Sequence, residues 1–289
     1  MRRIPESELL INPDGSIFHL HLHPDQLADC IVMMGDPARV DMVASLFDSR
    51  QCEVQNREFR TITGTYRGKR ITALSHGIGG DNIDIVINEL DALVNIDLVQ
   101  RIEKVEKRSL SIVRIGTSGS LQPDVPLGAH LISSRSIGFD GVLNFYAGRD
   151  EVCDLAFEKK FCEFTRWSPQ HAAPYVVSAD RELLARLNHG DMVNGVTVSA
   201  NGFYGPQGRH LRLPLADDEL NHKIEAFRYG EEKITNYEME GAALAGLARL
   251  LGHHAVTVCD IIAGRTNRTA NVNYKGGMAE LIKKVLERI

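Results

Sequence analysis

Three arginines that follow predicted strands or turns are the residues of this chain best suited to bind an anion: Arg39, Arg57 and Arg114. Arg114 ends a short β-branched run, and we expect a turn immediately after it, at Gly116-Thr117-Ser118-Gly119. Glycines let backbone N–H groups approach a ligand, hydroxyls add donors, and a guanidinium offers a rigid fork to oxyanions. Because open α/β sheets bind ligands at the carboxyl ends of their strands, this pattern predicts an anion site there.

The overall charge restricts which anion this site would take. The 289 residues include 33 Lys and Arg against 38 Asp and Glu, which gives a net charge of -5. Binding of nucleic acid or a membrane surface through bulk charge is therefore not expected, whereas a local basic site suits a small anion. Any single arginine could equally pair with a surface carboxylate, and the sequence does not show that the three converge.

A second glycine-rich turn, Gly77-Ile78-Gly79-Gly80, precedes a predicted helix. Backbone N–H groups at a helix N-terminus can hold an anion. The turn lacks the spacing of the dinucleotide fingerprint and the lysine of a P-loop. Close backbone packing is the alternative explanation.

Two carboxylates, Glu238 and Glu240, stand at the start of an apolar stretch that we expect to be a helix over residues 234–251. Acidic residues in a first turn favour the helix dipole, which would explain them without a ligand. The expected helix is almost entirely apolar and therefore buried, and buried carboxylates usually have a partner. A ligand with hydroxyl groups is one candidate partner.

A polar loop after a predicted strand contains Phe203, Gln207 and Arg209. Glutamine both donates and accepts hydrogen bonds, and arginine only donates. Together they could recognise an amide-like edge such as that of a pyrimidine ring, with Phe203 stacking on the ring. An ordinary polar loop is the alternative.

Three histidines alternate at positions 19, 21 and 23, and a strand would place His19, His21 and His23 on one face. No cysteine or carboxylate cluster accompanies them, so no metal site is predicted.

The five cysteines have no CxxC spacing, and we expect reduced, buried thiols in a cytoplasmic protein. We expect neither a secretory signal nor a membrane-spanning helix.

The elements that would position these residues alternate along the chain. We expect strands over residues 30–34, 60–66, 70–75, 111–115, 129–134, 194–199 and 255–262. We expect helices over residues 37–47, 82–94, 180–188 and 234–251, and from residue 278 onward. Residues 144–174 are predicted to be irregular, as an insertion or lid. The alternation predicts an α/β fold, with residues 1–289 in a single domain around a central mixed, mostly parallel sheet flanked by helices.

Seven segments in a characteristic order resemble the nucleoside phosphorylase-I family, and most closely its members that act on uridine. The segments are Phe-His-Leu, Gly-Asp-Pro-Ala-Arg-Val, Arg-Glu-Phe, Gly-Ile-Gly-Gly, Arg-Ile-Gly-Thr-Ser-Gly, Phe-Tyr-x-x-Gln-x-Arg and Asn-Tyr-Glu-Met-Glu. Each is modest alone, but seven in order are specific, and they extend over nearly the whole chain.

The resemblance implies a role for each candidate residue. Phosphate would be bound by Gly35, Arg39, Arg57, Arg114 and Thr117. The ribose would be held by Glu238, Met239 and Glu240, and by His19, which would reach the 5′-hydroxyl in a neighbouring subunit. The base would be recognised by Phe203, Gln207 and Arg209, with Arg265 near its O4. The residues implied in catalysis are Arg114, Gln207, Arg209, Glu240 and Arg265.

The implied reaction is reversible phosphorolysis of uridine to uracil and ribose 1-phosphate, in pyrimidine salvage. It implies a homo-oligomer, a dimer or a hexamer built from dimers, and no organic cofactor; a monovalent cation near Glu58 is left open. Asp260 falls where purine-specific relatives carry a base-protonating aspartate, so a purine or broad-specificity phosphorylase is the alternative. Two further alternatives are a nucleoside hydrolase and a nucleoside-binding protein. A hydrolase would need no phosphate site, and a binding protein would not consume its nucleoside.

Overall fold

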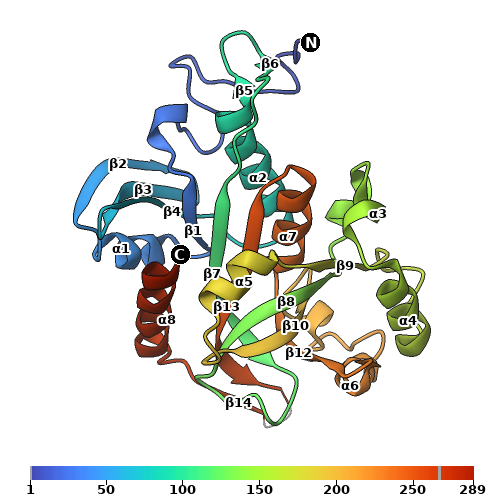
Figure 1. Cartoon of the computed structure of the whole chain (residues 1–289). Helices are drawn as coiled ribbons and strands as arrows, with labels where there is room; N and C mark the ends of the chain where they lie inside the picture. The colour runs from blue at the N-terminus through green and yellow to red at the C-terminus, as the bar shows by residue number, and fades with distance from the viewer. Residues whose placement is uncertain (1, 266–267) are drawn as a thin grey trace.

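The computed structural model of the chain describes residues 2–265 and 268–289 (Figure 1). Within this part of the chain, twelve strands form one sheet. They are β1 (Cys30–Met34), β2 (Ser49–Asn56), β3 (Phe59–Tyr66), β4 (Lys69–Ser75), β7 (Ser111–Ser120), β8 (His130–Gly138), β9 (Tyr175–Ser178), β10 (Val193–Ser199), β11 (Arg228–Tyr229), β12 (Glu232–Glu238), β13 (His254–Gly264) and β14 (Thr269–Ala270). A separate pair consists of β5 (Ile96–Asp97) and β6 (Ile102–Glu103).

The main sheet has the strand order β11-β12-β10-β8-β13-β7-β1-β4-β3-β2. Strand β1 is parallel to both β4 and β7, and β7 is parallel to β13. The hairpins β2–β3 and β3–β4 are antiparallel, as is the β8–β13 pair. The predicted mixed sheet is therefore confirmed, but the expectation that it is mostly parallel is wrong, because hairpin and return connections contribute many antiparallel pairs.

One additional pairing closes part of the sheet on itself. Strand β12 pairs antiparallel with the end of β7, with Asn236 opposite Ser120 and Tyr237 opposite Gly119. Strands β7, β13, β8, β10 and β12 consequently form a closed ring of neighbours. This closure brings Glu238, the last residue of β12, next to the carboxyl-terminal part of β7.

The helices are α1 (Pro37–Ala44), α2 (Gly80–Asn95), α3 (Arg149–Val152), α4 (Leu155–Thr165), α5 (Arg181–Leu187), α6 (Leu220–Ala226), α7 (Gly241–Leu250) and α8 (Lys275–Arg288). Short 3-10 turns occupy Pro24–Gln26, Val142–Phe145 and Gly205–Gln207. No helix in the described ranges is long and apolar enough to cross a membrane.

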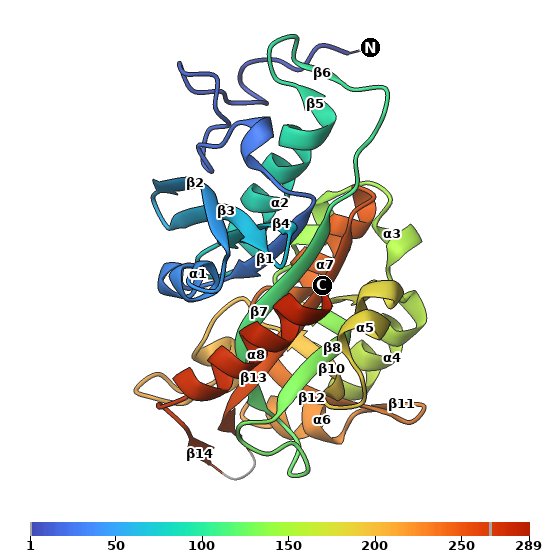
Figure 2. The same ribbon diagram turned by 60° about the vertical axis from the view of Figure 1, so that its left-hand side comes forward.

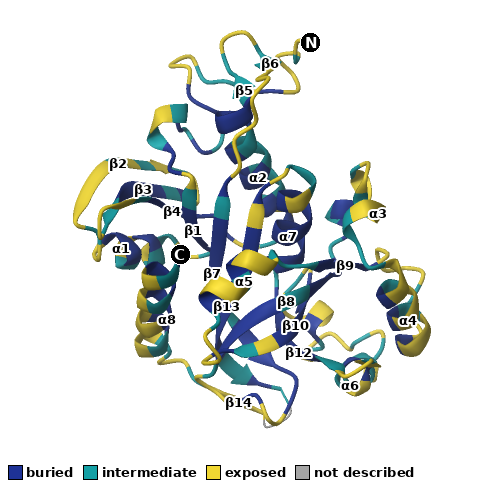
Figure 3. Cartoon of the chain, viewed as in Figure 1, coloured by how far each residue is buried: buried dark blue, intermediate teal, exposed yellow. Residues whose placement is uncertain are grey.

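Helices cover both faces of the central strands (Figures 1 and 2). Side chains of a strand alternate between its two faces, and β1 shows the consequence. Its Ile31 and Met33 join a cluster with α2 and α7, while Val32 and Met34 join a second cluster with α1, α5 and α8. Most residues of the central strands are accordingly buried, as are the first eight residues of α7, Gly241 to Ala248 (Figure 3). The expected α/β fold with flanking helices is confirmed.

Residues 144–174 are more regular than predicted. They contain α3 and α4, and Phe157 and Phe161 of α4 are buried in a third apolar cluster with strands β8, β10 and β12. The spacing of four residues between these phenylalanines is that of one face of a helix. The expectation that this segment is irregular is therefore wrong.

Two predicted boundaries next to the candidate site are also wrong. The predicted turn at Gly116–Gly119 is the last part of strand β7. The predicted helix over residues 234–251 begins as strand β12 and becomes helix α7 only at Gly241. The β-branched and aromatic residues Ile234, Thr235 and Tyr237 fit a strand better than a helix.

Candidate active site

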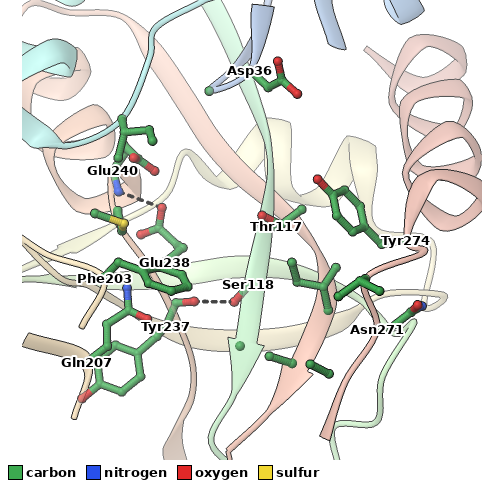
Figure 4. A pocket seen from close by; sticks show the side chains of 18 of the residues that line it. Asp36, Thr117, Ser118, Phe203, Gln207, Tyr237, Glu238, Glu240, Asn271 and Tyr274 are labelled. Carbon is green, nitrogen blue, oxygen red and sulfur yellow. Dashed lines mark hydrogen bonds between the residues drawn. The ribbon is translucent and has the colours of Figure 1, made fainter. Parts of the chain in front are cut away.

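A cavity of about 1200 Å³ opens where the ends of β7, β12 and β13 meet the turns that follow β1 and β4 (Figure 4). It is lined by most of the residues that the sequence singled out. These are Gly35, Arg39, Arg114, Thr117, Phe203, Gln207, Arg209, Glu238, Met239, Glu240 and Arg265. The cavity therefore gathers residues from widely separated parts of the chain into one site.

One end of the cavity is formed by two glycine turns in close contact. Gly77 N donates a hydrogen bond to Gly35 O at 3.1 Å. A Cβ at position 35 would lie 2.9 Å from Gly77 O, and Gly77 has a positive φ of 76°. Both positions therefore require glycine for this approach.

Arg39 projects into this end from the first turn of α1, which Asp36 caps by accepting a hydrogen bond from Ala38 N at 2.9 Å. Its closest hydrogen-bond acceptor is Ile115 O at 3.5 Å, and its buried Nε has no partner among the described residues. Burial lowers the pKa of Arg39, and the nearby charge of Arg114 lowers it further. A bound anion would give Arg39 Nε a hydrogen-bond partner and would offset the free-energy cost of burying the charged guanidinium.

Arg114 lies in the middle of the cavity wall and is only 4% exposed. One terminal nitrogen lies 2.8 Å from Glu238 Oε2, and the other donates a short hydrogen bond to Glu240. Burial by itself would lower the pKa of Arg114, but Glu240 and Glu238 raise it above its ordinary value. The guanidinium is thus permanently charged and fixed in orientation.

His76 is a functional neighbour that the sequence analysis did not single out. It is fully buried at the end of β4, and its Nε2 accepts a hydrogen bond from Arg114 Nε at 3.2 Å. Burial lowers the pKa of His76 well below its usual range, and the charges of Arg114 and Arg39 add to this effect. A neutral His76 therefore carries its proton on Nδ1 and helps to orient Arg114. Its position directly before the Gly77 turn was the available sequence signal.

The two glutamates have different surroundings. Glu238 accepts hydrogen bonds from Glu240 N at 2.8 Å and Gly241 N at 2.9 Å, and a short one from the Ser199 hydroxyl, so it caps helix α7. Glu240 accepts from Gly79 N at 2.7 Å, which ties the second glycine turn to the Arg114 cluster.

Burial also affects the charge of Glu240. It raises the pKa of this carboxyl, Arg114 opposes that rise, and Glu238 adds to it. The carboxylate form of Glu240 thus depends on Arg114 for its stabilisation.

The other end of the cavity contains two arginines without carboxylate partners. Arg209 donates to Gln207 Oε1 at 2.6 Å, and its guanidinium lies 3.6 Å from the centroid of the Phe203 ring. Arg265 donates to Gln207 O at 2.7 Å. Neither arginine forms an ion pair with a carboxylate in the part of the chain that the structure describes. Burial and the charge of Arg265 lower the pKa of Arg209 to about 10.

These contacts define the chemistry of that end. In Figure 4, Phe203, Gln207 and Tyr237 lie together on the side of Glu238, away from Asp36. An aromatic face, one amide and two uncompensated cations suit a flat group that carries carbonyl oxygens or gains negative charge.

Two residues expected at the site do not line the cavity of their own chain. Asn56 Nδ2 donates to His19 O at 2.7 Å, and the Arg57 guanidinium lies 5.8 Å from the Phe18 ring centroid. His19 and Arg57 therefore belong to one neighbourhood outside the cavity lining. Arg57 thus does not join Arg39 and Arg114 in the cavity of its own chain, and its expected part in binding phosphate stays a prediction.

The alternating histidines do not lie on a strand. His19 Nδ1 lies 2.6 Å from Glu89 Oε1, whereas His21 Nε2 lies 3.0 Å from Asp14 Oδ2. No group of three or more His, Cys, Asp or Glu side chains in the described ranges is arranged to hold a metal.

Asp260, on which the purine alternative depended, points away from the cavity. It is 1% exposed and packs under helix α8, where a Cβ on Gly277 would lie 2.8 Å from its Oδ2. The cavity is lined instead by the next part of β13, Ile262 to Arg265. Because Asp260 does not line the cavity, this geometry does not support the alternative of a purine phosphorylase that depended on it.

The five cysteines are all unpaired, but only Cys259 is fully buried. Burial raises the pKa of its thiol to about 12, so this cysteine is an unreactive thiol beside Arg114. Cys30, Cys52, Cys153 and Cys162 are half-buried, and the expectation of burial is wrong for them.

Comparison with known proteins places this architecture in a family. The sequence profile described as "Phosphorylase superfamily" matches residues 29–289, and the chain belongs to that superfamily. The nucleoside phosphorylase-like fold expected from the seven segments is thereby confirmed.

The most informative relatives are named for one activity. The chain is 28% identical over 267 residues to a uridine phosphorylase of Thermococcus kodakarensis, covering 92% of this chain and 83% of the relative. It is 30% identical over 253 residues to a uridine phosphorylase of Treponema pallidum, covering 87% of this chain and 83% of the relative. The crystal structure of a Trypanosoma brucei nucleoside phosphorylase, described as showing uridine phosphorylase activity, has a TM-score of 0.86 and 28% identity. The structural match covers 97% of this chain and 98% of the Trypanosoma brucei chain.

Proposed function

We propose that this protein is a uridine phosphorylase, a pentosyltransferase that converts uridine and phosphate reversibly into uracil and ribose 1-phosphate. One observation carries the proposal: the cavity has an incompletely paired cation at one end, Arg39, and two at the other, Arg209 and Arg265, with Glu238 and Glu240 between them. Phosphorolysis needs cations at both ends of the cavity, because the phosphate anion attacks at one end while the base leaves as an anion at the other. The names of the relatives support the same activity.

Each part of the cavity then has a role. Phosphate lies at Gly35, Arg39, Arg114 and Thr117, below the anomeric carbon of the ribose. Glu240 accepts hydrogen bonds from the ribose hydroxyls beside Met239, and Glu238 holds Arg114 and the start of α7 in place. Uracil stacks on Phe203 and is read by Gln207, Arg209 and Arg265.

The mechanism follows from these charges. The glycosidic C–N bond lengthens and its electron pair moves into the uracil ring, while positive charge grows on the ribose. Phosphate attacks the anomeric carbon from the opposite side and forms the new C–O bond. Arg209 and Arg265 bind the anionic leaving group more strongly than the neutral base, and this difference lowers the barrier.

We further propose that the active unit is a homo-oligomer, a dimer or a hexamer built from dimers. Its support is the position of His19 and Arg57, which lie near each other but outside the cavity of their own chain. In an oligomer they would reach a neighbouring cavity, where Arg57 completes the phosphate site and His19 binds the ribose. The unpaired cysteines suit a reducing compartment, and we propose a cytoplasmic enzyme with residues 1–289 in a single domain.

The experiment that tests the proposal follows the loss of uridine by ultraviolet absorbance with and without phosphate. The proposal expects turnover only with phosphate, with ribose 1-phosphate as the product. Equal loss of uridine without phosphate would identify a hydrolase instead.

A further inference from the structure

The loop that carries Gln207 is held from behind by Asn221, a residue of α6 that does not line the cavity. Asn221 Nδ2 donates a hydrogen bond to the backbone carbonyl of Gln207 at 3.1 Å. Arg265 donates to the same carbonyl at 2.7 Å. Asn221 Oδ1 in turn accepts a hydrogen bond from the Tyr237 hydroxyl at 2.9 Å. One amide therefore connects the base-reading loop to a residue of the central sheet.

The fit around Asn221 is close. Gly208 has a positive φ of 66°, and a Cβ there would lie 2.1 Å from Asn221 Nδ2. The asparagine side chain presents an NH2 donor and a carbonyl acceptor in a single plane, and this site uses both. The sheet end of the link is fixed, because Tyr237 is buried and pairs with Gly119 of β7.

The loop depends on such contacts for its position. Between β10 and α6 the chain forms no regular element except the short 3-10 turn Gly205–Gln207. A segment with so few internal hydrogen bonds takes its geometry from its neighbours. Gln207 and Tyr237 both line the cavity and both hydrogen-bond Asn221, so Asn221 acts directly behind the base end of the cavity.

We propose that Asn221 is a positioning residue for base recognition. Asn221 holds the backbone carbonyl of Gln207, to which Arg265 also donates. It thereby fixes the side-chain amide of Gln207 and the guanidinium of Arg265, which face the base. This inference rests on the proposed function. Neither Arg39 nor Arg114 hydrogen-bonds Asn221, so we expect the phosphate end to keep its geometry when Asn221 is lost.

The test compares Asn221→Ala and Tyr237→Phe with the wild type in steady-state kinetics. Each variant breaks the link, and we expect KM for uridine to rise about tenfold, the loss typical of one or two hydrogen bonds. KM for phosphate, and the increase in Tm that phosphate produces, should stay at wild-type values. His222→Ala is the matched control, because His222 is the exposed neighbour on the same helix.

Two results would overturn the inference. One is a KM for uridine within about twofold of the wild type in both variants, which is less than one lost hydrogen bond implies. The other is a parallel loss of phosphate affinity, which would identify a general structural role. Failure of the wild type to turn over uridine is a separate result that refutes the proposed function, and with it this inference.

Discussion

Arg114 and Glu240 form a buried ion pair across the centre of the cavity, although 126 residues separate them in the chain. Arg114 belongs to β7, and Glu240 is the residue just before α7. Glu240 also binds Gly79 N, so the pair connects the sheet, a buried helix and a glycine turn.

Removal of Arg114 should abolish most of the activity. Arg114→Ala takes away a phosphate-binding donor, and we expect kcat to fall by about 10²–10³, or about 2.7–4 kcal/mol. Because two buried carboxylates lose their partner, unfolding should also become easier by about 3–5 kcal/mol.

Activity of this variant is therefore measured well below its Tm and at saturating phosphate. Arg114→Lys keeps a charge but not the planar fork, and it separates loss of charge from loss of geometry. Near-normal turnover by Arg114→Ala would refute the assigned role.

A mixture of two inactive variants should regain activity if subunits share sites. In a dimer of Arg57→Ala with Arg114→Ala, one of the two cavities keeps its own Arg114 and receives the partner's Arg57. Random pairing of co-expressed subunits then restores about a quarter of the wild-type activity. The single variants expressed alone are the controls, and a mixture no more active than either of them would contradict the shared site.

Asp260→Asn should leave uridine turnover unchanged, because Asp260 does not line the cavity. Burial raises the pKa of this carboxyl above 3.8, and its Oδ1 has no hydrogen-bond partner among the described residues. A raised pKa in the folded state means that Asp260 favours folding when protonated. The contribution of Asp260 to the free energy of unfolding is therefore lost as the pH rises from its ordinary pKa through its raised pKa in the folded protein.

The variant avoids this loss, so its advantage in Tm over the wild type should grow from pH 4 to pH 7. We expect about 1 kcal/mol at neutral pH, from removal of a buried unpaired charge. Urea unfolding of the variant and the wild type at several pH values measures this difference in the free energy of unfolding. A large fall in turnover would return Asp260 to the catalytic site.

Gln207→Ala should weaken the base end alone. We expect KM for uridine to rise about tenfold with little change in KM for phosphate, because the side chain of Gln207 contacts Arg209 at the base end and neither Arg39 nor Arg114. Initial rates with each substrate varied separately distinguish the two constants. Equal changes in both would mean that the cavity has no separate base end.

Local sequence predicted the elements that are self-contained. The apolar run Cys30–Met34 and then Pro37 indicated a strand followed by the start of a helix, and the structure has both. The strands predicted over residues 60–66 and 70–75 were also confirmed, and they pair as an antiparallel hairpin, although their neighbour β2 was not predicted. Regular spacing and capping residues act within a few positions, so the chain displays them directly.

Long-range contacts explain what was missed. Residue types over 234–237 favour a strand, but they do not mark where it ends. The change from β12 to α7 is fixed by the capping contact of Glu238 and its bond to Ser199. The pairing of His76 with Arg114 joins residues 38 apart, and Arg265 reaches a carbonyl 58 residues away. Such pairs follow from topology, which residue types alone do not specify.

The central claim is that the cavity carries out phosphorolysis of a pyrimidine nucleoside. Its most direct test measures kcat/KM for uridine, inosine and adenosine side by side, each with and without phosphate. The proposed assignment predicts phosphate-dependent turnover of uridine with little or none of the purines, because Asp260 points away and Gln207 and Arg209 read the base. Efficient turnover of inosine or adenosine, with uridine left intact, would contradict it.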